Sequence, residues 1–360
     1  MDRFLIIITL VLLASGAAMV YSTSSVMAMK KFGDEYFFIR KHLVFSAAGL
    51  ALLMISSRIP YRLYKNLAYP ILVLAIVLLI LVLVPGIGRH AGGARRWLRL
   101  GPVTFQPSEF AKLAVVIFLA YSLDVKKDRI RSFSVGFLPN MVIPGFIIAL
   151  ILAEPDLGTA ATLSILTGVM SFIGGVRLKH LLSAAAVLAP VFYVVVTSFD
   201  YMMKRLAVFA DPWKDPSGSG WQMVQSFLAF GSGGVWGAGL GEGKQKLFYL
   251  PEAHTDFIFS VIGEELGLVG VALIILLYCA LLFGGVRVAR RAKDLFGTYL
   301  ALGLTLMLSL QAAVNMAVVM GALPPKGLPL PFISYGGSSL VMSMIAVGII
   351  LNVYMKGNKA

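Results

Sequence analysis

The stretch LPEAHTDF, residues 250–257, places two carboxyl groups and an imidazole directly before a long apolar run. These groups belong to Glu252, His254 and Asp256. A carboxyl group at the edge of an apolar region is partly desolvated, which raises its pKa toward neutrality and suits it to act as a general base. The same residues could instead cap the next helix, through Thr255 or Asp256, or couple an ion in a transporter.

Two further carboxyl groups follow within the apolar run. Glu264 and Glu265 lie eight and nine residues beyond Asp256, which is about two helical turns. Glu264 is therefore expected to lie on the same helix face as Asp256.

A second group of charges lies in GRHAGGARRWLRLGPVTFQPSEFAKL, residues 88–113. Its charged side chains are those of Arg89, Arg95, Arg96, Arg99, Glu109 and Lys112. Pro107 fits the first turn of a helix, where Glu109 complements the helix dipole. Glu109 and Lys112 share one face inside the membrane boundary, where ionisable groups usually serve a function. The arginines either anchor the chain at the interface or bind a diphosphate or another anionic headgroup.

The stretch AEPDLGTA places Glu154 and Asp156 on either side of Pro155, between two apolar runs. One interpretation is a tight turn with Asp156 capping the following helix. The other is a pair of carboxylates at the rim of a cavity, which could hold a divalent cation or orient a basic residue.

A segment rich in proline and glycine, GALPPKGLPLPFISYGGSSL, separates the last two apolar runs. Irregular backbone at membrane depth is tolerated only against protein or a polar cavity. We expect its polar side chains to line that cavity, and they are those of Lys326, Ser334, Tyr335, Ser338 and Ser339. The N–H groups around Gly336 and Gly337, at the start of a helix, could receive phosphate oxygens. A purely structural re-entrant turn is the alternative.

The composition indicates a polytopic membrane protein. Of 360 residues, 59% are hydrophobic and 13% are charged, and the mean hydropathy is +0.87, whereas a soluble protein needs more charge to cover its surface. With Cys279 as the one cysteine and with four histidines, neither a disulfide nor a zinc site is indicated. The net charge of +14 is scattered through short loops. That distribution favours anionic lipid headgroups or an anionic substrate over nucleic acid.

The apolar runs predict an all-α fold of about ten transmembrane helices forming one domain, residues 1–360. The predicted spans are 4–22, 42–57, 67–85, 108–125, 137–153, 157–175, 180–198, 257–286, 296–322 and 339–355. The first run is predicted to be a retained helix rather than a signal peptide. A large extracytoplasmic loop, residues 199–256, is expected to join the seventh and eighth spans, with amphipathic helices that lie at the outer membrane surface and are linked by glycine turns. The acid-poor basic loops favour cytoplasmic termini.

Together these motifs resemble those of the SEDS family (shape, elongation, division, sporulation), which includes FtsW and RodA. The resemblance lies in GARRWL, PSEFAKL, EPDLGTA, DPW, GSGWQMVQS, LPEAHTDFIFSVIGEELG and PPKGLPLPFISYGGSSL, in family order along the whole chain. The stretches MVYSTSS, FADPWKDP and KLFYLPEAHTDF are more similar to the FtsW branch than to the RodA branch.

The resemblance implies a peptidoglycan glycosyltransferase that polymerises lipid II, the undecaprenyl-diphosphate-linked disaccharide-pentapeptide, outside the bacterial cytoplasmic membrane. It implies that Asp256 is the family's essential aspartate, which we expect to be the general base. Expected partners are a class B penicillin-binding protein and other membrane proteins of division or elongation. Expected substrate-binding residues are Arg95, Arg96, Glu109, Lys112, Glu154, Lys326, Ser334 and Ser338. No organic cofactor is expected, whereas a divalent cation, Mg²⁺ or Mn²⁺, is a candidate with unknown ligands. A lipid II transporter, or flippase, and a non-enzymatic scaffold are the alternative functions.

Overall fold

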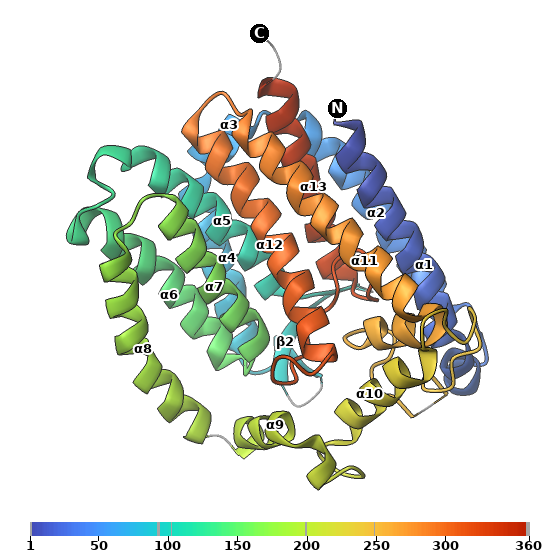
Figure 1. Cartoon of the computed structure of the whole chain (residues 1–360). Helices are drawn as coiled ribbons and strands as arrows, with labels where there is room; N and C mark the ends of the chain where they lie inside the picture. The colour runs from blue at the N-terminus through green and yellow to red at the C-terminus, as the bar shows by residue number, and fades with distance from the viewer. Residues whose placement is uncertain (1, 92–93, 102, 199, 248, 358–360) are drawn as a thin grey trace.

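A computed structural model describes residues 2–91, 94–101, 103–198, 200–247 and 249–357. Long helices dominate the fold (Figure 1). The helices are α1 (Arg3–Phe32), α2 (Phe37–Arg58), α3 (Tyr61–Asn66), α4 (Ala68–Leu83), α5 (Pro107–Val125), α6 (Leu138–Ala153), α7 (Leu157–Ile173), α8 (Leu178–Ser198), α9 (Asp200–Ala210), α10 (Trp221–Gly233), α11 (Ile258–Arg290), α12 (Leu295–Val319) and α13 (Gly337–Gly357).

Each of the ten predicted spans coincides with one of these helices. In the described part of the chain, six helical segments are long and apolar enough to cross a membrane, and shorter apolar helices accompany them. The all-α membrane fold is therefore confirmed. The largest difference is at α1, which continues ten residues past the predicted end because MVYSTSSVMAMKKF, residues 19–32, lacks proline and glycine.

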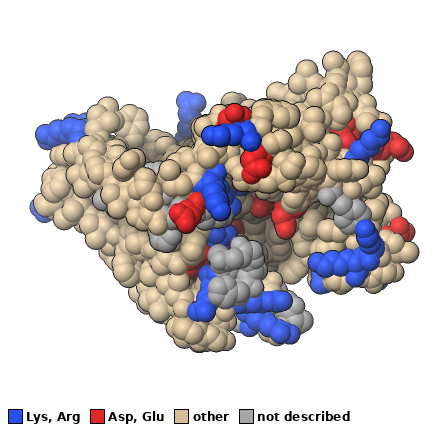
Figure 2. Space-filling view, turned by 90° about the horizontal axis from the view of Figure 1, so that it is seen from below, with Lys and Arg blue, Asp and Glu red and all other residues tan. Residues whose placement is uncertain are grey.

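The two termini lie at one end of the helical bundle, while β2, α9 and α10 lie at the opposite end (Figure 1). This arrangement agrees with an even number of crossings. Seen from that opposite end, the molecule has a recess in the middle of its face with acidic and basic side chains around it (Figure 2). The residues that could do chemistry therefore gather at the end away from the termini.

The centre of the bundle is α5, which packs against α4 and α12. Every residue from Val115 to Ala120 is at most 1% exposed. A helix that is apolar on all sides in this way belongs inside a bundle. By contrast α8 leaves Leu182, Val187 and Tyr193 exposed, as expected for a helix that faces lipid.

Residues 88–105, between the third and fourth predicted spans, form a small antiparallel sheet that the apolar pattern did not predict. The strands are β1 (Gly88–Ala91), β2 (Ala94–Leu100) and β3 (Val103–Phe105), in the order β1-β2-β3. Ala91 pairs with Ala94, and Leu100 pairs with Val103, so that each strand runs antiparallel to the next. Pairing the backbone groups allows this segment to stay ordered at the end of the bundle.

The loop at residues 199–256 contains two helices, α9 and α10, as the sequence predicts. Phe199, the first residue of the predicted loop, lies outside the described residues. The location of these helices at a membrane surface stays a prediction.

A break in α11 fixes the second half of this loop. Gly267 has a left-handed backbone (φ 63°, ψ −163°) inside the helix. On one side of the break, the N–H groups of residues 238–239 in the loop donate to the carbonyls of residues 264–265, at 2.9 and 3.0 Å. On the other side, the N–H groups of residues 268–269 donate to the loop carbonyls of residues 234–235, at 2.9 and 3.2 Å. The loop backbone thus satisfies the polar groups that the broken helix exposes.

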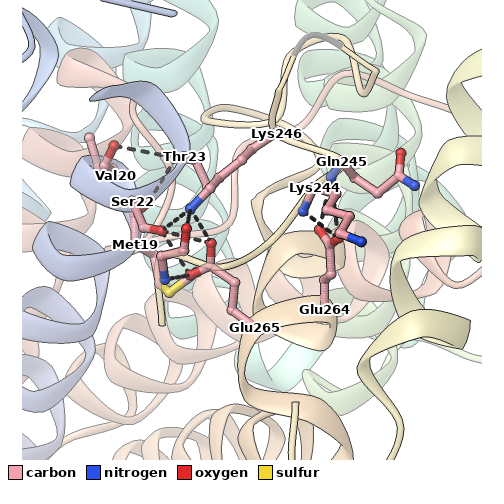
Figure 3. A network of polar contacts seen from close by, with 10 residues as sticks. Met19, Val20, Ser22, Thr23, Lys244, Gln245, Lys246, Glu264 and Glu265 are labelled. Carbon is pink, nitrogen blue, oxygen red and sulfur yellow. Dashed lines mark hydrogen bonds and ion pairs between the residues drawn. The ribbon is translucent and has the colours of Figure 1, made fainter. Parts of the chain in front are cut away.

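Buried side chains reinforce this junction (Figure 3). The Nζ of Lys246 donates to Glu265 Oε1 at 2.7 Å, to Ser22 Oγ at 2.9 Å and to the Gly241 carbonyl at 2.7 Å. The side chains of Lys246 and Glu265 are 5% and 0% exposed. Lys246 therefore ties the loop to α11 and, through Ser22, to α1.

The neighbouring Glu264 does not share the face of Asp256, so that prediction is wrong. Its carboxylate accepts hydrogen bonds from the backbone N–H groups of Lys244, at 2.7 Å, and Gln245, at 3.2 Å (Figure 3). Helical spacing alone did not show that the preceding loop folds back to bind it.

Removing one partner of the buried ion pair is expected to destabilise the fold. Lys246→Met leaves Glu265 without its cation, and such a loss costs about 3–5 kcal/mol. The matched control is Lys244→Met, whose exposed side chain should cost no more than about 0.5 kcal/mol because only its backbone binds Glu264. The free energy of unfolding of both variants, measured in mixed micelles, tests this prediction, and equal losses would contradict it.

Candidate active site

Two cavities meet at Asp256. One, the aromatic cavity, has a volume of about 360 Å³ and contains the side chains of Phe45, Trp97 and Tyr335. The other, the basic cavity, has a volume of about 460 Å³ and is lined by Lys204, Arg205 and Lys326 among others. The residues that line both are Arg96, Glu252, Asp256 and Gly327. Asp256 can therefore contact molecules that occupy either cavity.

The backbone around Asp256 is held from two sides. The Asn315 amide on α12 donates to the Asp256 carbonyl at 2.8 Å and to the Leu328 carbonyl at 2.6 Å. The Ser334 hydroxyl donates to the Thr255 carbonyl at 2.5 Å. The chain before α11 is thus fixed to the Pro-Gly segment between α12 and α13, which orients the carboxyl group toward the cavities.

The alternative in which Thr255 or Asp256 caps helix α11 is wrong. Helix α11 begins at Ile258 with Phe257 at its N-cap. The Thr255 hydroxyl donates to Glu252 instead, at 2.9 Å from its carboxylate. The Asp256 carboxyl group remains directed toward the cavities.

The environment of Asp256 favours its protonated form. Its pKa is raised to about 7, chiefly by burial and also by the carboxylates of Glu252 and Asp156, while the guanidinium groups of Arg205 and Arg96 oppose this rise. The side chain is half-buried, so it retains an opening to the cavities. Close to pH 7 a large share of the carboxyl groups is ionised, which suits a general base.

Arg96 is fixed at the boundary between the two cavities. It lies on β2, and its Nε donates to the Glu154 carbonyl at 3.1 Å while Nη2 donates to the Pro155 carbonyl. The turn between α6 and α7 therefore positions this guanidinium through backbone carbonyls, and its charge is left for a ligand.

Glu109 and Lys112 form a buried ion pair at 2.8 Å, as their shared helix face predicts. Lys112 also donates to Gln311 on α12 at 2.5 Å. Glu109 lines the aromatic cavity, whereas Lys112 lies behind it. The pair neutralises a charge at membrane depth and leaves Lys112 away from a ligand in either cavity.

The second carboxylate pair divides into two roles. Asp156 caps α7, accepting from the Thr159 N–H at 3.1 Å, as predicted. Glu154 is fully buried, and its carboxyl oxygens accept no hydrogen bond from the residues that the structure describes. Burial raises the Glu154 pKa to about 8, helped by Asp156 and opposed by Arg96, so Glu154 is mostly protonated at neutral pH. It lines neither cavity.

Of the predicted substrate-binding residues, three line the cavities, namely Arg96, Glu109 and Lys326. Two others support the walls. Ser334 orders the backbone beside Asp256, and the Ser338 hydroxyl accepts from the Gln106 N–H at 3.1 Å. Arg95 lies directly before Arg96 on β2 and lines neither cavity.

Several lining residues were missed by the sequence reasoning. They are Phe45, Trp97, Thr104, Gln106, Lys204 and Arg205. The strand residues could have been found from the sequence, since a Gly-Gly pair such as residues 92–93 between two short strand-like segments is typical of a hairpin turn. For the basic pair on α9, the amphipathic stretch DYMMKRLAVFA was a signal, but it does not indicate what its charges face.

The donors for a metal ion are sparse. Within the described ranges no group of three or more His, Cys, Asp or Glu side chains could hold an ion. Mg²⁺, however, is often bound by one or two carboxylates together with substrate phosphates. The carboxyl groups shared by the two cavities, Glu252 and Asp256, fit that lesser requirement.

Comparison with known proteins gives full-length matches. Residues 2–359 match the cell cycle protein family of FtsW, RodA and SpoVE. A probable peptidoglycan glycosyltransferase FtsW of Geobacter sulfurreducens is 48% identical over 352 residues, covering 98% of this chain and 94% of that protein. Stage V sporulation protein E of Bacillus subtilis is 43% identical, covering 98% and 96%.

Solved structures agree with these relatives. A chain from a peptidoglycan synthase complex, reported for its coordination of polymerization and crosslinking, has a TM-score of 0.82 at 30% identity and covers 100% of this chain and 99% of that one. The rod shape determining protein RodA of Thermus thermophilus has a TM-score of 0.71 at 28% identity, covering 100% and 98%.

Proposed function

The chain belongs to the SEDS family of FtsW, RodA and SpoVE, and from this premise we propose that Asp256 is the general base with which it builds glycan strands. It is a multi-pass membrane protein and a peptidoglycan glycosyltransferase of the FtsW type, polymerising lipid II in cell wall synthesis. The observation that carries the proposal is the position of Asp256 where two cavities meet.

The reaction joins two lipid-linked sugars. The 4-hydroxyl oxygen of the acceptor GlcNAc forms a bond to C1 of the donor MurNAc, and the bond from C1 to the diphosphate oxygen breaks. The hydroxyl proton passes to the Asp256 carboxylate, and the undecaprenyl diphosphate leaves as an anion. A carboxylate within reach of both substrates is therefore required, and a location between two cavities supports this role for Asp256.

Positive charge at the leaving group lowers the barrier further. Among the candidates from the sequence, Arg96 and Lys326 line the basic cavity beside Asp256. Lys112 is engaged by Glu109 and Gln311, which favours a structural role for it. We assign stabilisation of the departing diphosphate to Arg96 and Lys326.

The orientation in the membrane follows from the substrate. The lipid tails stay in the bilayer while the sugars react at its surface, so the end of the bundle that holds Asp256 faces outward. The termini lie at the other end (Figure 1) and would then be cytoplasmic, which agrees with the distribution of basic loops. The bacterial cytoplasmic membrane is the proposed location.

We propose a class B penicillin-binding protein as the working partner, together with other membrane proteins of division or elongation. The support is the solved relative, which comes from a complex that combines polymerization and crosslinking. A glycan strand made at the outer surface needs a crosslinking enzyme beside it.

A divalent cation is proposed as a further component. Glu252, which lines both cavities, would hold Mg²⁺ or Mn²⁺ together with the substrate diphosphate and leave Asp256 free as the base, and the ion would supply positive charge to that diphosphate. Removal of divalent ions with EDTA is expected to lower strand synthesis at least about tenfold, with recovery on adding Mg²⁺ or Mn²⁺. Synthesis unchanged by EDTA would contradict this part of the proposal.

Replacing the base is expected to stop strand synthesis. Asp256→Asn should lower the rate of lipid II polymerisation by about 10²–10⁴-fold, the usual contribution of a general base. The wild-type rate should fall as the pH drops below about 7, because the required ionised form of Asp256 is lost there. Polymer formation by the purified protein with its penicillin-binding partner, measured from pH 5.5 to 8.5, checks both. A transporter would yield no polymer in this assay.

The stability of the same variant provides the control for folding. Because the folded protein raises the pKa of Asp256, ionisation costs stability as the pH rises from about 4 through 7. Asp256→Asn should lack this loss and unfold no more easily than the wild type at pH 8. A variant that polymerises normally would refute the assignment of the base.

The space beside the carboxylate provides a second test. A β-carbon at Gly327 would lie 2.7 Å from Asp256 Oδ2, so Gly327→Ala must turn the carboxylate away. We expect polymerisation to fall about tenfold or more with little change in unfolding. Gly231→Ala on α10 is the matched control, because a β-carbon there meets open space among the described residues. Equal activity of the two variants would show that the position of Asp256 is not critical.

A further inference from the structure

The two cavities beside Asp256 differ in charge. The basic cavity is lined by four cationic side chains, those of Arg96, Lys204, Arg205 and Lys326, against the carboxyl groups of Glu252 and Asp256. The aromatic cavity has one lining cation, Arg96; it shares Glu252 and Asp256 with the basic cavity, and its third carboxyl group, that of Glu109, is paired with Lys112. A diphosphate is therefore attracted more strongly to the basic cavity than to the aromatic cavity.

We propose that the basic cavity is the donor subsite, where Lys204 and Arg205 of α9 join Lys326 in binding the diphosphate that leaves, and that the aromatic cavity is the acceptor subsite. This division rests on the proposed function, since it presumes that Asp256 serves the reaction between two lipid-linked sugars. It adds α9 to the binding machinery and gives each cavity one substrate.

The cations of the basic cavity come from two elements that are fixed to each other. On α9, the adjacent residues Lys204 and Arg205 line the cavity, together with Val208 one helical turn further along. Arg205 Nη1 donates to the Pro325 carbonyl at 3.0 Å, directly before Lys326. The helix α9 is thus tethered to the Pro-Gly segment, so that cations from both elements surround the same space.

Crowding of these cations also favours an anionic ligand. Burial lowers the pKa of Lys326, and the neighbouring Arg205 guanidinium lowers it further. A bound diphosphate removes this repulsion, because its oxygens accept charge-assisted hydrogen bonds from both side chains. Arginine and lysine at one site suit a diphosphate, which offers several anionic oxygens in different directions.

The chemistry of the two substrates matches this arrangement. In the donor, the diphosphate is bonded to the same C1 that the hydroxyl attacks, so it must lie within about one sugar ring of Asp256. In the acceptor, the reactive 4-hydroxyl and the diphosphate lie at opposite ends of a disaccharide. The cationic cavity that touches Asp256 therefore fits the donor, and the acceptor presents neutral sugar to the base.

The aromatic cavity is suited to that neutral sugar. Phe45, Trp97 and Tyr335 offer apolar ring surfaces, and Thr104 and Gln106 offer polar groups for sugar hydroxyls. Its carboxyl groups would oppose a diphosphate but can accept hydrogen bonds from hydroxyl groups. Such a lining orients a hydroxyl toward Asp256 without attracting the anion.

The experiment measures binding of undecaprenyl diphosphate to full-length protein in nanodiscs, with undecaprenyl monophosphate as the comparison ligand. The wild-type protein serves as the parent, because undecaprenyl diphosphate carries no sugar and is not turned over. Arg205→Gln and Lys326→Gln should each weaken diphosphate binding about tenfold or more, the loss expected for a charge-assisted hydrogen bond, and should reduce the preference over monophosphate. The charge control is Lys214→Gln, an exposed basic residue outside both cavities that should bind as the parent does.

Variants of the aromatic cavity provide the complementary test. Thr104→Val and Trp97→Leu should keep diphosphate affinity while raising the lipid II concentration needed for half-maximal polymerisation in the active protein. Unchanged diphosphate binding in both basic-cavity variants, or an equal loss in the aromatic-cavity variants, would overturn the division. Lys326→Arg, which keeps the positive charge, should bind the diphosphate more tightly than Lys326→Gln. The unfolding midpoints of both variants should match that of the parent, which separates loss of charge from loss of folding. These binding results are independent of the Asp256→Asn activity assay, so failure of one proposal is distinguishable from failure of the other.

Discussion

The break of α11 at Gly267 determines where Asp256 can lie. A continuous helix would carry the chain straight through the end of the bundle opposite the termini, whereas the break allows the first turns, Ile258–Leu266, to run separately from the rest of the helix. A broken helix exposes carbonyl and N–H groups that need partners at membrane depth. The loop at residues 234–239 supplies these partners. A β-carbon at Gly237 would lie 2.2 Å from the Glu265 carbonyl oxygen, so this contact requires glycine.

The same junction explains the cluster of acids in the second half of the loop and the start of α11. Glu264 and Glu265 bind the backbone and Lys246 (Figure 3), whereas Glu252 and Asp256 line the cavities. The carboxyl groups that hold the loop are thus separate from the proposed base. The separation matters because a base with a pKa near 7 depends on a fixed degree of burial and on fixed neighbours.

The sequence predicted the parts of the fold that depend on local pattern. Every long apolar run became a helix, Pro107 opened α5, and Asp156 capped α7. The predictions that failed depended on contacts distant in sequence. Glu264 is turned away from Asp256 by a loop that lies twenty residues earlier, and Arg96 reaches the site through a small sheet whose strands are too short to give a clear period. Helical spacing and composition contain no information on such contacts.

Sequence reasoning also singled out Asp256, but it did not show the two cavities that meet there. Asp256, Arg96, Glu109 and Lys326 belong to motifs with unusual charge, so they stand out in an apolar chain. Lys204 and Arg205 look like ordinary charges on an amphipathic helix, and they gain meaning only because α9 lies across the basic cavity. A polymerase must hold two substrates of nearly the same composition at once, so it has to distinguish them by which end each presents. A cationic cavity beside one with excess carboxyl groups makes that distinction, because a diphosphate and a sugar hydroxyl respond to charge in opposite ways.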